Sequence, residues 1–220
     1  MGSGARGRTG RHICLFGLTA AGKTTHAKLL AQQLGCDYVS ASQLMFDELG
    51  YHDPGDHGTW VRSSSEISTK REDGSVDREV NRKLLALARG TSRIVFDSWT
   101  LPFMVRETSD LGGQVIFLRL DSNMRSRAVK SLVSLGAGAQ LSVTAATRLV
   151  GEKDASSRQI FVRTFGFDIF RPADYFGPGE QLIINVGEFV YGVNPDQVRK
   201  GVRDAHQRVM LRITEWPGGL

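Results

Sequence analysis

Residues 17–24 read Gly-Leu-Thr-Ala-Ala-Gly-Lys-Thr and follow directly on the apolar run Ile13–Phe16. They match the pattern G-x-x-x-x-G-K-[ST], in which glycines let a loop turn so tightly that its backbone N–H groups point at a bound phosphate. Apolar residues then recur at helical spacing from Lys23 to Leu34, so a helix N-terminus is expected to add its partial positive charge. The sequence therefore predicts a strand, a phosphate-binding loop and a helix in succession.

This loop predicts that the chain binds a nucleoside triphosphate together with Mg²⁺. Lys23 is expected to reach the β and γ phosphates, and the Thr24 hydroxyl is expected to be the metal ligand. The alternative is a degenerate loop that keeps its shape without a ligand. The residues predicted to hold the nucleotide are Gly17, Ala21, Gly22, Lys23, Thr24 and Thr25.

Length and composition favour one globular domain. The chain has 220 residues, 40% of them hydrophobic, and carries no long apolar segment of the kind that spans a membrane. We expect residues 11–220 to form a single domain and residues 1–10, rich in Gly, Ser and Arg, to be a disordered tail or an expression scar without a signal sequence. Cys14 and Cys36 fit a reduced compartment better than a disulfide, which predicts a cytoplasmic protein.

The charge balance gives little guidance to a partner. The formal net charge is +5, but the basic residues are spread along the chain without a Lys/Arg block or interleaved aromatic residues. A phosphate-handling site explains scattered arginines as well as a nucleic acid does. We expect neither a nucleic-acid nor a membrane partner, and the oligomeric state is left open.

Short apolar stretches alternate with helical ones along the rest of the chain. This alternation is typical of a parallel sheet that is covered by helices on both faces. Strands are predicted at 13–16, 37–39, 94–96, 115–118 and 182–184, and helices at 23–34, through 44–49, and at 60–70, 76–88, 122–135, 144–164 and 195–213.

Several of these stretches together resemble the cytidylate kinase family of nucleoside monophosphate kinases over roughly residues 11 to 205. The family pattern G-x-x-x-x-G-K-[ST]-T-x-A-K-x-L-A runs from Gly17 to Ala31, and is followed by L-G and by a strand that ends in Ser-Ala-Ser. Further similarities are Val95-Phe96-Asp97 with the family's strand before Asp-Gly-Arg, Ile116-Phe117-Leu118 and Arg125 with I-F-L followed by R-x-x-R, Glu152 to Arg158 with the lid run R-[DE]-x-x-[DS]-x-x-R, and Phe165 to Asp168 with Y-G-I-D.

The resemblance implies an α/β fold of the P-loop NTPase type, a three-layer sandwich with a five-stranded parallel sheet. It also implies a helical acceptor-binding segment at about 40–90, a lid at about 136–160 hinged at Gly136–Gly138, and ATP with Mg²⁺ as cofactors. Arg125 is expected to pack on adenine. The lid residues expected to close over the transferred phosphoryl group are Lys153, Arg158 and Arg163.

The sequence departs from the family where the acceptor's phosphate is held. The two family arginines are replaced by residues 44–47, Leu-Met-Phe-Asp, and by Trp99. Because a dianionic phosphate favours bidentate guanidinium partners, CMP is expected to be a poor acceptor unless another arginine compensates. The candidate arginines are Arg62, Arg71 and Arg82, and the residues predicted to bind the acceptor are Ser40, Ser42, Asp97, Trp99 and Arg62.

Asp97 and Trp99 each have a second interpretation. Asp97 ends a buried strand, where ligands of parallel sheets bind, and is expected to orient Mg²⁺ waters or bind the acceptor; otherwise it caps the next helix. Trp99 is an acceptor-stacking residue or an ordinary core aromatic.

Three functions are consistent with these patterns. The leading one is an ATP-dependent kinase that transfers the γ-phosphoryl group to a nucleoside monophosphate, with Lys23, Asp97, Lys153 and Arg158 as catalytic residues. The second is a kinase for a small metabolite or antibiotic on the same scaffold. The third is a non-catalytic nucleotide switch, which is less well supported because no N-K-x-D guanine reader occurs.

Overall fold

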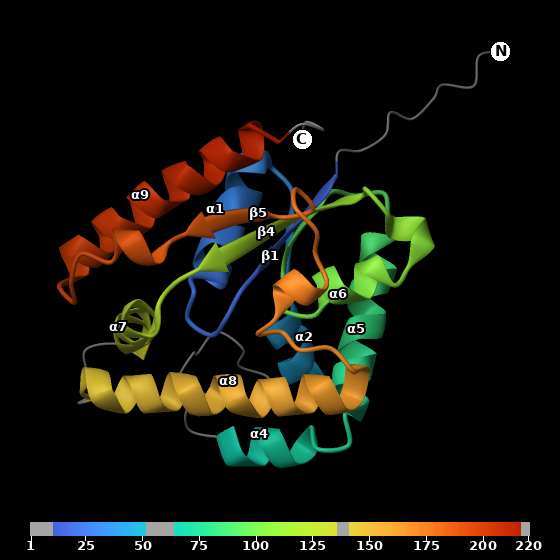
Figure 1. Cartoon of the computed structure of the whole chain (residues 1–220), viewed down its shortest axis with the longest axis horizontal. Coiled ribbons are helices and arrows are strands. Elements are labelled where there is room, and N and C mark those ends of the chain that lie inside the picture. The colour runs from blue at the N-terminus through green and yellow to red at the C-terminus, as the bar shows by residue number, and fades with distance from the viewer. Residues whose placement is uncertain (1–10, 52–63, 136–140, 217–220) are drawn as a thin grey trace.

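The strand β1 (His12–Phe16) is buried along its whole length and lies at the centre of the sheet in the computed structural model (Figure 1). Its side chains alternate between two hydrophobic clusters, Ile13 and Leu15 in one and Cys14 and Phe16 in the other. A strand with apolar residues on both faces is stable only when helices cover both. The structure describes residues 11–51, 64–135 and 141–216.

The sheet has five strands in the order β2-β3-β1-β4-β5, and all pairs are parallel. Leu15 of β1 lies opposite Asp97 of β3 and Leu118 of β4, so the carboxyl ends of these strands meet at one edge. The predicted α/β fold, a five-stranded parallel sheet between helical layers, is confirmed. The strands are β1 (His12–Phe16), β2 (Asp37–Ser40), β3 (Ile94–Asp97), β4 (Val115–Asp121) and β5 (Leu182–Asn185).

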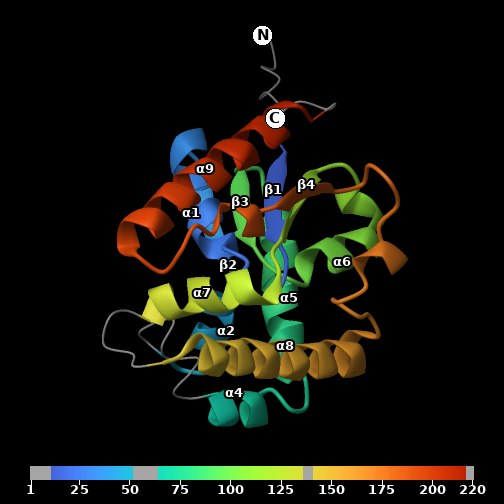
Figure 2. The same cartoon turned by 60° about the vertical axis from the view of Figure 1, so that its left-hand side comes forward.

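Helices form three groups around this sheet (Figures 1 and 2). The first and last helices cover one face of the sheet. The two helices that directly precede and follow β3 in the chain lie on the opposite face, and the others gather beyond the carboxyl ends of the strands. In chain order the helices are α1 (Lys23–Leu34), α2 (Ala41–Glu48), α4 (Ser64–Lys70), α5 (Ser75–Ala88), α6 (Leu101–Arg106), α7 (Met124–Leu135), α8 (Val143–Phe165) and α9 (Pro195–Thr214), with 3₁₀ turns η1 (Ser109–Leu111), η2 (Pro172–Asp174) and η3 (Gly187–Phe189).

The structure contains elements that were not predicted, namely the three 3₁₀ turns and the short helix α6. In α6, Pro102 occupies the first turn, where a missing N–H costs nothing. The predicted helix over 60–70 is described only from Ser64, as α4. The predicted tail at 1–10 and the hinge at Gly136–Gly138 lie outside the described residues.

The helix α8 occupies most of the predicted lid segment. It runs unbroken for 23 residues, begins at the cap Ser142 and ends at Gly166, whose φ of 76° suits glycine. Figures 1 and 2 show it crossing below the carboxyl edge of the sheet, between α7 and α4. Among its buried residues are Val150, Asp154 and Ile160, so this helix packs as part of the core.

None of the described helices combines the length and the apolar character that crossing a membrane requires.

Candidate active site

The loop between β1 and α1 has the backbone of a phosphate cradle. Gly17 has φ 139°, and a Cβ there would lie 2.4 Å from the carbonyl oxygen of Leu120, so no other residue fits. Gly22 has φ 101°. Ala20, with φ 58°, is the one described non-glycine residue in the left-handed region, a conformation that costs free energy and clusters at functional sites. The loop therefore keeps this backbone conformation at some cost in the free energy of folding.

Lys23 lies at the first position of α1, inside this loop. Its ammonium group donates to the carbonyl oxygen of Leu18 at 3.2 Å and lies 5.2 Å from the centroid of the Trp99 ring. Burial lowers the pKa of Lys23, with the nearby charge of Asp97 opposing this effect. A partly buried ammonium held by a carbonyl and a ring face is able to exchange these partners for phosphate oxygens.

Thr24 and Asp97 lie together at the mouth of the loop. The Thr24 hydroxyl donates to the carboxylate of Asp97 at 2.5 Å. Two hard oxygen ligands at one point, beside a loop for phosphates, match the donors that Mg²⁺ prefers, so these residues fit the metal that the motif implies. Burial and the charge of Asp97 raise the pKa of Tyr38 to about 12, which keeps its hydroxyl protonated beside this pair.

Asp97 does not cap the helix that follows it. The N-cap of α6 is Thr100, and the Ser98 hydroxyl accepts from the backbone N–H groups of Thr100 and Leu101 at 3.3 Å and 3.1 Å. The carboxylate of Asp97 is left for the Thr24 contact.

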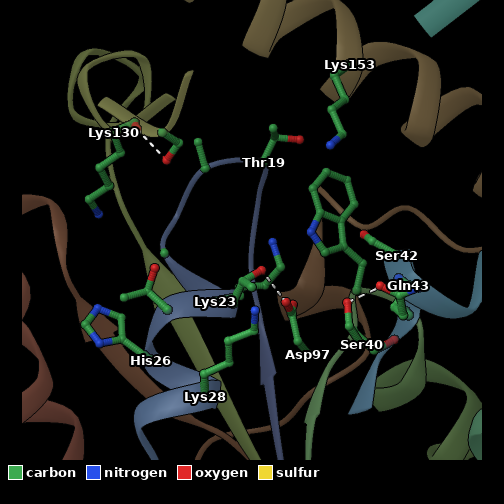
Figure 3. Close-up of a pocket in the computed structure, with 18 of the residues that line it drawn as sticks. Thr19, Lys23, His26, Lys28, Ser40, Ser42, Gln43, Asp97, Lys130 and Lys153 are labelled. Atoms are coloured by element: carbon green, nitrogen blue, oxygen red, sulfur yellow. Dashed lines mark hydrogen bonds between the residues drawn. The ribbon is translucent and has the colours of Figure 1, made fainter. Parts of the chain in front are cut away.

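A cavity of about 1040 Å³ opens over the loop and extends to both sides of it (Figure 3). We call its two ends the nucleotide arm and the acceptor arm. The nucleotide arm lies between α1, α7, η3 and α9, and its walls are mainly apolar; they include His26, Val129, Lys130, Val133, Val186, Phe189 and Val202. The acceptor arm lies between α2, α5, α8 and the end of β3; its walls include Ser40, Ser42, Met45, Phe46, Arg71, Asp77, Asn81, Trp99, Lys153 and Phe161.

The predicted acceptor residues Ser40, Ser42, Asp97 and Trp99 all line the cavity. Ser40 also caps α2, since its hydroxyl accepts from the backbone N–H of Gln43 at 3.4 Å. Trp99 is half-buried and touches the Phe161 ring edge-on, with ring centroids 6.2 Å apart. Its position at the junction of the loop and the acceptor arm fits both interpretations, because one side packs in the core and the other meets Lys23.

The three arginines that were candidates for binding the acceptor's phosphate lie in different places. Arg71 lines the cavity, but its guanidinium is bonded to Asp77 through two atoms, at 3.0 Å and 2.6 Å, and both side chains are almost fully buried. Arg82 is exposed, pairs with Glu79 and does not line the cavity. Arg62 lies outside the described residues. Within the described structure, Arg71 is the only arginine in the cavity wall, and its charge is already matched.

Of the predicted lid residues, one lines the cavity and two do not. Lys153 points from α8 into the cavity (Figure 3). Burial and the nearby charges of Lys23 and Arg71 lower its pKa to about 7. Arg158 is on another side of α8, bonded to Asp168 at 3.0 Å and 2.5 Å, and Arg163 donates to the carbonyl oxygen of Glu72. The structure brings Lys153 to the site and leaves these two arginines outside the cavity wall.

Arg125, predicted to pack on adenine, is exposed at the start of α7 and does not line the cavity. Lys130, one and a half turns further along, does. Its ammonium group donates to the carbonyl oxygen of Ala21 at 3.2 Å and contacts the Ser122 hydroxyl and the Val186 carbonyl oxygen at 3.5 Å. Burial, then the charge of Arg127, lowers its pKa to about 8. Lys130 was not predicted from the sequence.

A buried ion pair ties the loop to α7 and α8. Arg127 and Asp154 bond to each other, and their side chains are 5% and 3% exposed. Arg127 also donates to the carbonyl oxygen of Thr19 at 3.2 Å, and Asp154 accepts from the Thr19 N–H at 3.1 Å. This pair was also not predicted. In the sequence, Arg127 and Asp154 are single charged residues on two predicted helices, and a charged residue on a helix usually faces solvent.

Comparison with known proteins supports the fold. No family model matches the chain, and no curated protein matches it. Among solved structures it is similar to a shikimate kinase from Bacteroides thetaiotaomicron, at 14% identity and a TM-score of 0.52, over 91% of this chain and 98% of that one. A gluconokinase from Sinorhizobium meliloti 1021 is 15% identical over 93% and 98% of the two chains, with a TM-score of 0.48. A deoxyadenosine kinase from M. mycoides is 12% identical over 92% and 98%, with a TM-score of 0.46. The chain has the fold of a P-loop kinase, and a specific relation to cytidylate kinases stays a prediction.

Proposed function

We propose that this protein is an ATP-dependent kinase that phosphorylates a hydroxyl group of a small molecule. The observation that carries this proposal is a single cavity that joins the phosphate loop to a walled acceptor arm, with Asp97 and Trp99 at the junction. A switch protein has no need of such an arm, because its readout is a change of surface. ATP, Mg²⁺ and the acceptor are the proposed ligands, and the cytoplasm remains the predicted location.

The proposed roles follow from positions in the cavity. Phosphoryl transfer forms a bond from the acceptor oxygen to the γ phosphorus and breaks the bond from that phosphorus to the β,γ-bridging oxygen, so the protein mainly orients groups and offsets charge. Mg²⁺, held by Thr24 and Asp97, would neutralise phosphate charge. Lys23 within the loop and Lys153 from α8 supply positive charge to the same space. Asp97 is the carboxylate at the junction, where the oxygen that does not face Thr24 can accept a hydrogen bond from the acceptor's hydroxyl group and orient it.

The acceptor arm favours an acceptor without a phosphate group. Among the described residues, the arginine in its wall is bonded to Asp77, and the wall beside it is apolar and aromatic, with Met45, Phe46 and Phe161. Among the described residues, a desolvated dianion there would meet no guanidinium other than that of Arg71, which is bonded to Asp77. The second candidate, a nucleoside monophosphate such as CMP, rests on the sequence resemblance.

An acceptor screen tests the proposal. With ATP and Mg²⁺ saturating, we expect ADP release with at least one neutral alcohol, such as a nucleoside, a polyol or an aminoglycoside. We expect a kcat/KM for CMP far below the range of efficient enzymes, about 10⁵ M⁻¹s⁻¹. Efficient use of CMP, dCMP, UMP or AMP would instead establish the nucleoside monophosphate kinase. If neither the neutral alcohols nor the nucleoside monophosphates stimulate ADP release, both candidates are contradicted.

The pH dependence of kcat/KM for ATP tests the role of Lys153. An amine carries its charge below its pKa and loses it above, so kcat/KM is expected to fall as the pH rises through about 7, the pKa of Lys153 in the free protein. Lys153→Arg should move this fall to much higher pH, because a guanidinium stays charged. The exposed Lys70→Arg is the matched control and should leave the profile in place. A wild-type profile that is flat from pH 6 to 9 would remove Lys153 from the mechanism.

A further inference from the structure

Thr19, the third residue of the loop, has a buried hydroxyl group that forms no hydrogen bond within the described structure. The residue is 5% exposed and lines the cavity, yet its Oγ1 has no hydrogen-bond partner among the described residues. A buried hydroxyl that has given up water without gaining a partner destabilises the fold. Such a group is expected where a ligand supplies the missing partner.

The backbone of Thr19 is fixed at both of its polar atoms. Its N–H donates to Asp154 and its carbonyl oxygen accepts from Arg127, and these two side chains bond to each other. Because both helices that supply them are packed in the core, the peptide planes around Thr19 cannot rotate freely. The direction in which the side chain leaves the backbone is therefore set before any ligand arrives.

The hydroxyl lies on the limb of the loop that faces the acceptor arm. Figure 3 shows Thr19 between Lys130, on the nucleotide side, and Lys153, with its hydroxyl turned toward the Lys153 side. Phosphates that extend from the nucleotide arm across Lys23 toward the acceptor arm reach this limb with their terminal group. The ammonium groups of Lys23 and Lys153 both face the same space, which favours an anion there.

We propose that the Thr19 hydroxyl donates a hydrogen bond to a terminal phosphoryl oxygen of the bound nucleoside triphosphate, and that Arg127 and Asp154 position it. The inference rests on the proposed function, since it assumes a triphosphate in the loop. It adds a contact that distinguishes the triphosphate from the diphosphate. Lys23 and the backbone N–H groups serve both nucleotides, whereas Thr19 would serve the γ group alone.

Nucleotide binding without an acceptor tests this inference. We would measure by calorimetry the Kd of ADP and of an ATP analogue with an imido bridge between the β and γ phosphorus atoms, both with Mg²⁺. Thr19→Val keeps the shape and removes the hydroxyl, so the analogue should bind about tenfold to a hundredfold more weakly, the range for a hydrogen bond to a charged group. ADP should bind within about twofold of wild type. Thr19→Ser keeps the hydroxyl and should restore most of the analogue's affinity.

The melting temperature of the ligand-free variants separates this role from a structural one. Since Val leaves no orphaned hydroxyl, Thr19→Val should melt at or above the wild-type temperature. Equal weakening of ADP and analogue, or of neither, would overturn the inference while the kinase proposal stands. A wild-type protein that binds neither nucleotide would overturn both. A Thr19→Val protein that melts well below wild type would show that the hydroxyl has a partner in the fold, which also contradicts the inference.

Discussion

Replacing Lys23 by Ala should lower ATP turnover by about a hundredfold to a thousandfold or more, the range for losing one preorganised charge at a developing anion. Lys23 lies inside the loop, held in the ligand-free structure by the Leu18 carbonyl oxygen and the Trp99 ring. Neither contact is part of the core packing, so the fold should survive. Steady-state ADP release with the best acceptor from the screen is the measurement.

The control for Lys23→Ala is Lys70→Ala, which removes an exposed lysine on α4 that pairs with Glu66. It should leave turnover unchanged, because exposed pairs of this kind contribute little. Melting temperatures for both variants show whether any loss of turnover comes from unfolding. A folded Lys23→Ala protein with near wild-type turnover would contradict the kinase proposal itself.

Asp154→Asn should destabilise the protein by about 3–5 kcal/mol, because it leaves the buried Arg127 charge without a counter-charge. For a domain whose total stability is about 5–15 kcal/mol, this loss is large. The free energy of unfolding from urea titration is the measurement.

The same helix offers a matched control for Asp154→Asn. Glu152 pairs with Arg148 across 3.7 Å on the exposed side of α8, where the two side chains are 62% and 74% exposed. Glu152→Gln should change the unfolding free energy by at most about 0.5 kcal/mol. If Asp154→Asn is equally mild, the buried pair does not anchor the loop. The double change of Arg127→Met with Asp154→Leu should recover much of the loss, since no lone charge is left.

The parts of the candidate site that the sequence indicates most directly depend on local constraints. The phosphate loop needs particular glycines and one lysine at fixed spacing, and Asp97 follows an apolar strand, so both are visible in short windows. The alternation of apolar strands and helices predicts the parallel sheet for the same reason.

The parts that the sequence does not predict depend on contacts between distant residues. Lys130 reaches the loop carbonyl of Ala21 across 109 positions, and Asp154 reaches Thr19 across 135. From the sequence alone, Lys130 and Arg125 are equally good candidates for a helix residue that faces the nucleotide. The rotation of α7 about its axis in the folded protein places Lys130 at the cavity and Arg125 at the solvent. Similarly, only the folded structure shows that Arg71 is already bonded to Asp77.

The strand order places β3 between β2 and β1, although β3 comes later in the chain than both. As a result, the end of β3 is where the two arms of the cavity meet, while the remaining acceptor walls come from α2, from α5 and from the part of α8 that carries Lys153 and Phe161. The partners that hold the loop come from α7 and from Asp154 of α8, and none of them belongs to α2 or α5. Under the proposed function, mutations in α2 and α5 change the acceptor arm and leave the phosphate loop and the nucleotide arm unaltered. Acceptor specificity can therefore change during evolution through substitutions in these two helices, while ATP binding is retained.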